Sequence, residues 1–115
     1  MFYILLSPFG CATNITFVEV TDDFDFNDVL GSFSVDVICK KSYALVVDDE
    51  FLFKPNLLPN GAASRLYNGS DFSILGNAVL AKYSYGSEDI EPFSTVIEAV
   101  EFFDNLMKGG SYLDN

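Results

Sequence analysis

The side chains of this 115-residue chain that could do chemistry are mainly carboxylates, because 17 residues are acidic, six are basic and none is histidine. Without histidine, no serine or cysteine has the base that usually activates it as a nucleophile. The sequence also lacks the glycine-rich loop that cradles phosphates in many nucleotide-dependent enzymes. We therefore expect a binding protein that is not an enzyme and that carries no cofactor.

One acidic segment resembles the first half of a calcium-binding loop. Asp23, Asp25 and Asn27 stand where such a loop has its first three oxygen ligands. The sixth position, which should be glycine, is Asp28, and the twelfth, which should be a bidentate glutamate, is Ser34. Since the turn glycine and the second acid are both missing, we expect no metal site, only an acidic loop whose two phenylalanines point inward.

A second acidic segment consists of Asp48, Asp49 and Glu50. Neighbouring carboxylates are able to bind a hard metal ion or to act as acid and base in hydrolysis. Side chains that follow one another directly at a turn, however, point in different directions and repel one another in solvent. We therefore expect a solvated hairpin turn here.

The cysteines and the first residues bear on the compartment. Cys11 and Cys39 lie far apart without CxxC spacing, so we expect two buried free thiols and neither a metal site nor a redox motif. A disulfide between them is the alternative for an exported chain. Residues 1–8 have no basic residue before a short apolar run, which predicts a strand and not a secretory leader. No apolar stretch is long enough to cross a membrane. These features predict a cytoplasmic protein with no membrane partner.

The charge balance indicates the kind of partner. A net charge of −11 would repel the phosphates of a nucleic acid, so no direct nucleic-acid binding is expected, whereas a basic protein surface would be attracted. The chain is half hydrophobic and 16% aromatic, which excludes a disordered acidic tail. The carboxylates expected to contact a basic partner are Asp22, Asp23, Asp25, Asp28, Asp48, Asp49, Glu50, Glu98 and Glu101.

A small signalling nucleotide is an alternative partner, held by the loop over residues 58–65. Asn60 would line the pocket, Arg65 would meet a phosphate and Tyr67 would stack on a base. The competing interpretation of this loop is a structural crossover in which the arginine pairs with a neighbouring acid.

Apolar runs and turn residues predict the elements that must position these groups. Strands are expected over residues 1–6, 16–20, 33–39, 43–47, 51–54 and 78–85. The acidic turn would join residues 43–54 into a hairpin, and Phe33, Val35, Val37 and Cys39 would share one buried side of their strand. Residues 25–31 predict a short helical turn that is capped by Asp25 or Asn27 and closed by Gly31.

The last element has the clearest pattern. Thr95 and Glu98 form a capping box, and two glycines end the run at residues 109–110. The apolar stripe expected to lie on the sheet is Val96, Val100, Phe103 and Met107, with Ile97 and Leu106 beside it. This order of elements predicts an α+β fold, a small antiparallel sheet with the C-terminal helix packed on one face. We expect one globular domain over residues 1–110 and a loose tail over residues 111–115.

Four short motifs resemble, in the same order, those of a family of small phage- and plasmid-encoded proteins of unknown function. They are Val29-Leu30-Gly31-Ser32, Leu45-Val46-Val47-Asp48-Asp49-Glu50, Leu57-Leu58-Pro59-Asn60 with Ala62-Ala63, and Ile74-Leu75-Gly76-Asn77-Ala78-Val79-Leu80. Ser32 and Phe51 stand where the family has a second turn glycine and the glycine of its acidic turn. The resemblance covers about residues 18 to 105.

The resemblance implies an accessory protein of a mobile element that works in the cytoplasm of an infected bacterium, and it supplies no catalytic residues. Together with the charge, it leads to the hypothesis of an inhibitor whose carboxylates occupy sites where DNA phosphates would sit, on a restriction, CRISPR or other nucleic-acid enzyme. The alternatives are a nucleotide sponge, a structural or assembly protein of a phage, and an acidic surface that only confers solubility. The many apolar residues also indicate a patch for a partner or a second copy, so a homodimer is compatible with the sequence.

Overall fold

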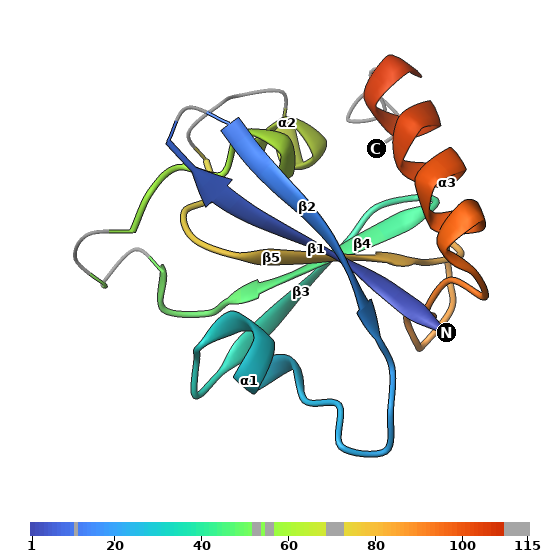
Figure 1. Ribbon diagram of the computed structural model, residues 1–115, viewed down its shortest axis with the longest axis horizontal. Coiled ribbons are helices and arrows are strands. Elements are labelled where there is room, and N and C mark those ends of the chain that lie inside the picture. The colour runs from blue at the N-terminus through green and yellow to red at the C-terminus, as the bar shows by residue number, and fades with distance from the viewer. Residues whose placement is uncertain (11, 52–53, 55–56, 69–72, 110–115) are drawn as a thin grey trace.

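The computed structural model describes residues 1–10, 12–51, 54, 57–68 and 73–109. A five-stranded antiparallel sheet forms its centre, and helices lie on both sides of it (Figure 1). In chain order the elements are β1 (Phe2–Phe9), β2 (Ala12–Glu19), α1 (Phe26–Leu30), β3 (Val35–Cys39), β4 (Tyr43–Asp48), α2 (Gly61–Asn68), β5 (Ala78–Lys82) and α3 (Val96–Gly109). The predicted α+β fold, with a C-terminal helix on an antiparallel sheet, is confirmed.

The sheet is built from two hairpins that a late strand joins. Its order is β2-β1-β5-β4-β3, so β5 lies between the hairpin β1–β2 and the hairpin β3–β4. Ile4 of β1 is opposite Phe17 of β2 on one side and Leu80 of β5 on the other. The two outermost strands, β2 and β3, are therefore the edges of the sheet.

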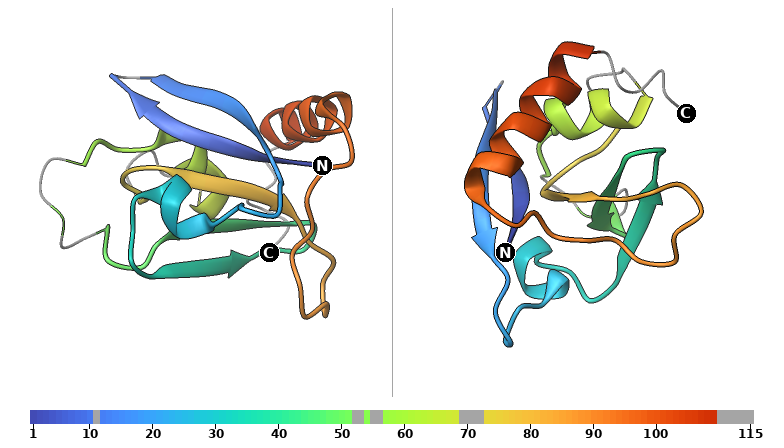
Figure 2. Two further views of the ribbon diagram at one scale, coloured as in Figure 1. Left: turned by 60° about the horizontal axis from the view of Figure 1, so that its bottom comes forward. Right: turned by 90° about the vertical axis from the view of Figure 1, so that its right-hand side faces the viewer.

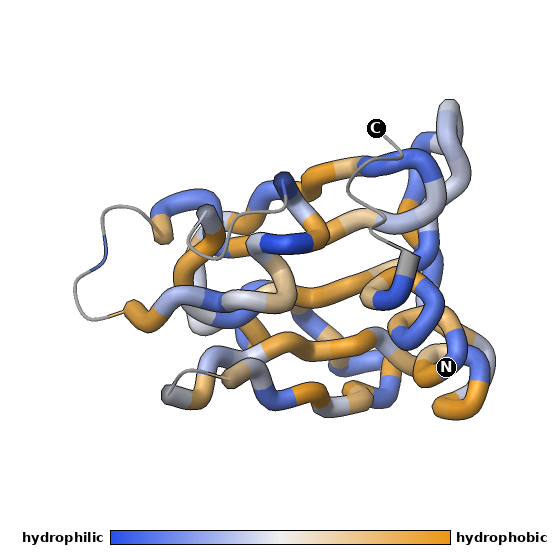
Figure 3. The backbone as a smooth tube through the Cα atoms, turned by 90° about the horizontal axis from the view of Figure 1, so that it is seen from above, coloured by the Kyte–Doolittle hydropathy of each residue, from blue (hydrophilic) through white to orange (hydrophobic). Residues whose placement is uncertain are grey.

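The two faces of the sheet carry separate hydrophobic clusters. On one face Ile4, Leu45 and Leu80 are buried beneath α2 and α3. On the other face, Tyr3 and Val79 are buried beneath α1 and the loop before it. Figure 2 shows this layering, with α2 and α3 above the strands and α1 below them in the right-hand view. Figure 3 shows hydrophobic residues along the central strands and hydrophilic ones in the turns.

The short helix α1 begins and ends at the residues that the sequence indicates. The Asp25 side chain accepts a hydrogen bond from the Asn27 amide at 2.9 Å, which satisfies an amide in the first turn. Gly31 ends the helix with φ 64°, a left-handed conformation that glycine adopts without steric cost. The predicted helical turn is confirmed.

The predicted hairpin over residues 43–54 is wrong. Both edges of β4 are already paired, one with β3 and one with β5, so no return strand has a free edge to join. Phe51 and Lys54 lie in a tight turn and a bend, while residues 52–53 are outside the described part. The chain after β4 instead leads toward α2.

Strand β3 is shorter and more exposed than its alternating pattern predicts. It begins at Val35, and the side chain of Phe33 before it is fully exposed. Val37 and Cys39, predicted to face the core, are also exposed. An edge strand at the rim of a small sheet extends beyond the elements that cover its neighbours, so alternation alone does not bury it.

The cap of α3 is confirmed, and its predicted apolar stripe is buried only in its second half. Thr95 Oγ1 accepts a hydrogen bond from the Glu98 amide at 3.1 Å, as the capping box requires. Leu106 is buried and Phe103 and Met107 pack against the core, as predicted. Val96, Ile97 and Val100 are exposed instead, and the buried residue in the first half of the helix is Ala99. Ala99 is completely buried, so the face of α3 that lies on the sheet passes through Ala99 and Leu106. The predicted tail over residues 111–115 lies outside the described residues.

Candidate protein-binding surface

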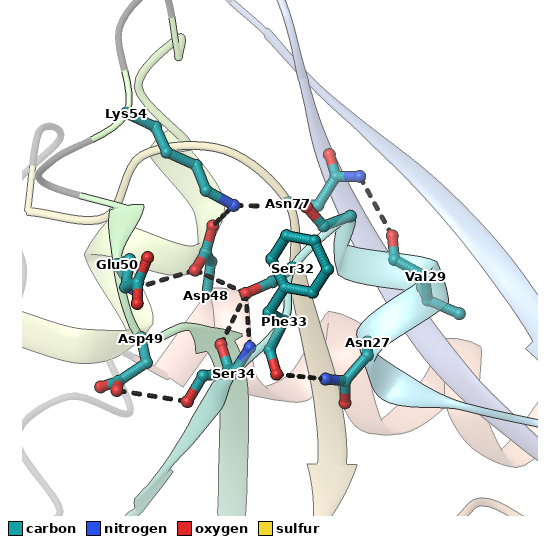
Figure 4. A network of polar contacts seen from close by, with 11 residues as sticks. Asn27, Val29, Ser32, Phe33, Ser34, Asp48, Asp49, Glu50, Lys54 and Asn77 are labelled. Carbon is teal, nitrogen blue, oxygen red and sulfur yellow. Dashed lines mark hydrogen bonds and ion pairs between the residues drawn. The ribbon is translucent and has the colours of Figure 1, made fainter.

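A network of hydrogen bonds around Asp48 joins the loop after α1 to the end of β4 (Figure 4). Ser32 Oγ lies 2.7 Å from Asp48 Oδ1, and the Glu50 amide donates to the same oxygen at 2.9 Å. Lys54 Nζ lies 2.5 Å from Asp48 Oδ2 and also donates to the Gly31 carbonyl at 3.3 Å. These contacts use both carboxylate oxygens inside the protein.

The prediction that Asp48 contacts a partner is wrong, because its carboxylate is buried and bonded within the protein. Only 5% of its surface is exposed, because the loop that carries Ser32 covers it. Burial acts to raise the pKa of the Asp48 carboxyl, but the bonds from Lys54, Ser32 and the Glu50 amide outweigh burial and hold the pKa below its ordinary value of 3.8. The carboxylate stays charged and holds the surrounding turn in place.

Phe33 is a large apolar residue that this network holds in solvent. Its side chain is 100% exposed. Its carbonyl accepts a hydrogen bond from Asn27 Nδ2 at 2.8 Å, and the neighbouring Ser34 carbonyl accepts from the Asp49 amide at 3.0 Å. Because the backbone on both sides of the ring is tied to α1 and β4, the ring is presented outward from a fixed loop.

Exposed carboxylates flank this loop. Asp49 and Glu50 follow directly after the buried Asp48, and Ser34 Oγ lies 3.4 Å from Asp49 Oδ2. Asp28 projects from α1, whose last turn contributes Gly31 to the same network. We define the acidic loop surface as Asp28, Phe33, Asp49 and Glu50, four exposed side chains carried by segments that the network joins.

The remaining acids of the first predicted group lie just before α1. Asp22 and Asp23 are exposed in the loop between β2 and α1. Asp25 is also exposed, but one of its oxygens caps α1. Phe24 and Phe26 pack against Tyr3 with ring centroids 5.3 and 5.1 Å away, as the inward-facing phenylalanines were expected to do. The loop therefore extends the acidic surface on the α1 side of the sheet.

The acids of α3 belong to a different side of the molecule. Helix α3 packs on the opposite face of the sheet from α1, so Glu98 and Glu101 do not join the acidic loop surface. The Ser94 amide donates to Glu98 Oε1 at 2.7 Å, and this bond, with a smaller effect from Lys82 Nζ at 3.3 Å, holds the pKa of the Glu98 carboxyl below its ordinary value. The carboxylate of Glu98 stays charged, and the nearby Lys82 balances part of that charge. Glu101 is the more exposed acid of the two.

The loop predicted to bind a nucleotide is used for structure instead. Asn60 is 0% exposed, and its side-chain amide donates to the Leu6 carbonyl at 2.9 Å and to the Gly76 carbonyl at 2.8 Å. Its Oδ1 accepts from the Ala63 amide at 3.1 Å, so the amide group and the oxygen of this side chain are both bonded within the protein. The prediction that Asn60 lines a pocket is wrong, because this side chain joins α2 to the sheet.

Arg65 and Tyr67 remain exposed on α2. The Lys40 ammonium lies 5.0 Å from the centroid of the Tyr67 ring and donates to the Tyr67 carbonyl at 2.6 Å. One face of the ring that was expected to stack on a base is therefore already covered by Lys40.

The arrangement of acidic side chains and the lengths of the helices bear on metal binding and on membrane spanning. No group of three or more Cys, Asp and Glu side chains there is arranged to hold a metal ion. Within the same residues, no helix is both long and apolar enough to cross a membrane.

The surface that sequence reasoning missed is centred on Phe33. Its ring was expected in the core because it alternates with Val35, but it comes two residues after the helix-ending Gly31 and stands between two serines. That Gly-Ser-Phe-Ser sequence is typical of a turn and is the signal that could have placed the ring outside. Comparisons with family models, with curated proteins and with solved structures found no match.

Proposed function

We propose that this chain is an acidic accessory protein of a mobile element that binds and inhibits a host protein with a basic surface, through the acidic loop surface. The observation that carries the proposal is Phe33, a fully exposed ring held outward by hydrogen bonds and flanked by exposed carboxylates. Aromatic residues held rigidly in the centre of a surface are typical anchors of protein interfaces.

The energetics favour a protein partner at this surface. Burying a phenylalanine side chain in a partner's pocket contributes about 1.5–3 kcal/mol. A loop that is already fixed loses little conformational freedom on binding, so more of that energy appears as affinity. The surrounding Asp28, Asp49 and Glu50 would meet basic residues at the rim of the interface.

The net charge of the chain also supports binding to a basic protein surface. A net charge of −11 accelerates encounter with a basic surface and excludes a nucleic acid. A partner that handles DNA or RNA has such a basic surface, and carboxylates seated on it would compete with phosphates. The inhibitor therefore acts as a mimic of DNA charge, with Phe33 adding an apolar contact that a phosphate backbone does not have.

The test is a pull-down from bacterial lysate at low and high salt, followed by binding and inhibition assays with the purified partner. Native protein is expected to retain a basic, nucleic-acid-binding protein at low salt, to lose it at high salt, and to displace DNA from it. Phe33→Ala should weaken binding about tenfold or more, because the anchor is lost. Tyr85→Ala, which truncates another exposed ring on the loop after β5, is the matched control.

Two outcomes would overturn the proposal. If Phe33→Ala binds the partner as tightly as the native chain, the acidic loop surface is not the contact. If no partner is displaced by DNA, the acidic surface serves solubility or phage assembly.

A cavity of about 350 Å³ favours a nucleotide as a second candidate ligand. It is lined by Cys39, Lys40, Lys41, Tyr83 and Tyr85, so two of the six basic residues lie beside two aromatic rings. An ammonium group and a phenol ring suit an aromatic anion such as a nucleotide. The sponge function would therefore use this cavity and not the loop around Asn60.

Calorimetric titration with a panel of mono- and cyclic dinucleotides tests this second candidate. Lys41→Ala and Tyr85→Ala should both abolish any heat of binding, whereas Phe33→Ala should leave it unchanged. No heat from any nucleotide would exclude the sponge. The two candidate functions therefore respond to different substitutions.

A further inference from the structure

The edge strand β2 has the features of a strand that pairs with another chain. Over the described residues β2 pairs with β1 alone, and its outer edge is open. Ala12 to Val18 contain no charged residue, although the whole chain has 23 acidic and basic residues among 115. The opposite edge, β3, is shorter and carries Asp36. Natural sheets usually protect a long edge with charge, and in β2 only the last residue, Glu19, supplies one.

The backbone groups that face outward from β2 follow from its register. The Val20 amide donates to the Met1 carbonyl, and hydrogen-bonded and non-bonded pairs alternate along an antiparallel ladder. Even-numbered residues of β2 therefore bond to β1. The amides and carbonyls of Thr13, Ile15 and Phe17 point to the open edge.

Apolar side chains continue from this edge onto α3. Ile15 is opposite the buried Leu6, so it lies on the same face of the sheet as α3, and it is 42% exposed. One flank of α3 carries Glu98, which contacts Lys82 of β5. Helical geometry places Val96, Val100, Phe103 and Met107 on the other flank, away from β5 and therefore on the side of β2. Both views in Figure 2 show α3 beside β1 and β2.

We infer that β2 pairs antiparallel with β2 of a second copy of this chain, so that two sheets join into one of ten strands about a twofold axis at Ile15. In this register Ile15 is opposite its own copy, and Thr13 is opposite Phe17 of the second copy. All three present outward-facing backbone groups, so a regular ladder can form. The half-exposed Val96 and Val100 beside the edge would lose solvent exposure.

The uncharged stretch Ala12–Val18 lets a second acidic copy approach this edge and offers a basic partner no carboxylate. Two chains of net charge −11 repel each other wherever acids meet, and the register centred on Ile15 places no acid opposite another acid. Ala12 is opposite Val18, Asn14 is opposite Thr16, and the same pairs repeat across the axis. A basic strand would instead be expected to meet carboxylates, which Ala12–Val18 do not offer.

Sedimentation velocity over a range of protein concentrations tests the inference. Native protein is expected to dimerise, and more strongly at about 0.5 M than at about 0.05 M NaCl, because salt screens the repulsion between two acidic chains. Binding to a basic partner has the opposite salt dependence, so the failure of this inference and that of the proposed function are distinguishable. The dimer edge and the acidic loop surface are also different residues.

Ile15→Lys puts two lysines opposite each other on the axis and is expected to weaken dimerisation about tenfold or more. Val37→Lys is the matched control, because Val37 is 44% exposed and lies on the opposite edge strand. Circular dichroism establishes that both variants fold. A native chain that is monomeric at every concentration, or a dimer that survives Ile15→Lys, would overturn the inference.

Amide hydrogen exchange of the native chain gives a test that needs no variant. In the dimer, the amides of Thr13, Ile15 and Phe17 gain protection as concentration rises, while those of Asn14 and Thr16 are protected in monomer and dimer alike. Concentration-independent, fast exchange at the three odd positions would overturn the inference. The inference would also be overturned if the chain is monomeric and the amides of Thr13, Ile15 and Phe17 gain protection only when a basic protein is bound. The edge of β2 would then be the binding site of that protein.

Discussion

The Asp48 carboxylate and the Ser32 hydroxyl lie 2.7 Å apart, and this contact closes the loop after α1 onto the end of β4. Sixteen residues separate the two in the chain. Val35 of β3 pairs directly with Asp48, so the contact stands at the first rung of the β3–β4 hairpin. The loop that presents Phe33 is thereby fixed at its base by a charged hydrogen bond.

Asp48→Asn should lower the free energy of unfolding by about 2 kcal/mol, because a carboxylate that accepts bonds from a hydroxyl, an amide and an ammonium is replaced by a neutral amide. Urea denaturation followed by circular dichroism measures the change. Asp49→Asn is the matched control and should stay within about 0.5 kcal/mol of the native chain, since its side chain is exposed. Equal stability of the two variants would show that the buried network is not important to the fold.

Stability should fall as the pH drops below about 4. The pKa values of Asp48 and Glu98 are lowered in the folded state, from ordinary values of 3.8 and 4.5. A carboxyl with a lowered pKa stabilises the fold at pH values above its ordinary pKa, and this contribution is lost as pH falls through the folded-state pKa. Unfolding free energies measured from pH 6 to the acid limit should therefore decrease, and less steeply in Asp48→Asn. A variant as acid-sensitive as the native chain would contradict this prediction.

Asn60→Ala should destabilise the protein by about 3 kcal/mol or more. The substitution removes the buried hydrogen bonds that the Leu6 and Gly76 carbonyls and the Ala63 amide make with this side chain. Asn105→Ala, an exposed site on α3, is the control and should cause no loss because alanine favours helix. Thermal and urea unfolding measure both variants, and a native-like Asn60→Ala would mean that water replaces these bonds.

Leu106→Ala should cost about 2–5 kcal/mol, whereas Val100→Ala should cost less than about 1 kcal/mol in the monomer. Leu106 is buried against the sheet, and Val100 is 46% exposed. Unfolding at low protein concentration compares the two without a contribution from self-association. Equal costs would contradict the observed orientation of α3.

Local signals carried most of what the sequence predicts correctly. The cap of α1 at Asp25 and its end at Gly31 depend on neighbouring residues only, and both are confirmed. The Thr95 cap of α3 is local in the same way. Such motifs act within one helical turn, so no knowledge of the rest of the fold is needed.

The errors concern residues whose environment is decided by distant parts of the chain. The return strand predicted after β4 has no edge to join, because β3 pairs with one edge and β5, about thirty residues later, pairs with the other. Val100 was expected in the core because its spacing is helical, but the neighbouring Ala99 is the residue that the sheet covers. The residues around Asn60 are typical of a loop, so the sequence predicts an exposed side chain. It is buried because the sheet and α2 enclose it from two sides. Periodicity gives the faces of an element without saying which face another element will cover.

The place of β5 in the sheet has a consequence for how the chain folds. Each outer hairpin is made of local contacts and forms early, whereas Ile4 and Leu80 must meet from opposite ends of the sequence. Neither hairpin has a complete core until β5 is inserted between them, so the slow, cooperative step is the closure of this long loop. A ribosome-bound chain that ends before residue 78 would therefore have two separate hairpins with exposed hydrophobic surfaces, and the domain would not yet be folded.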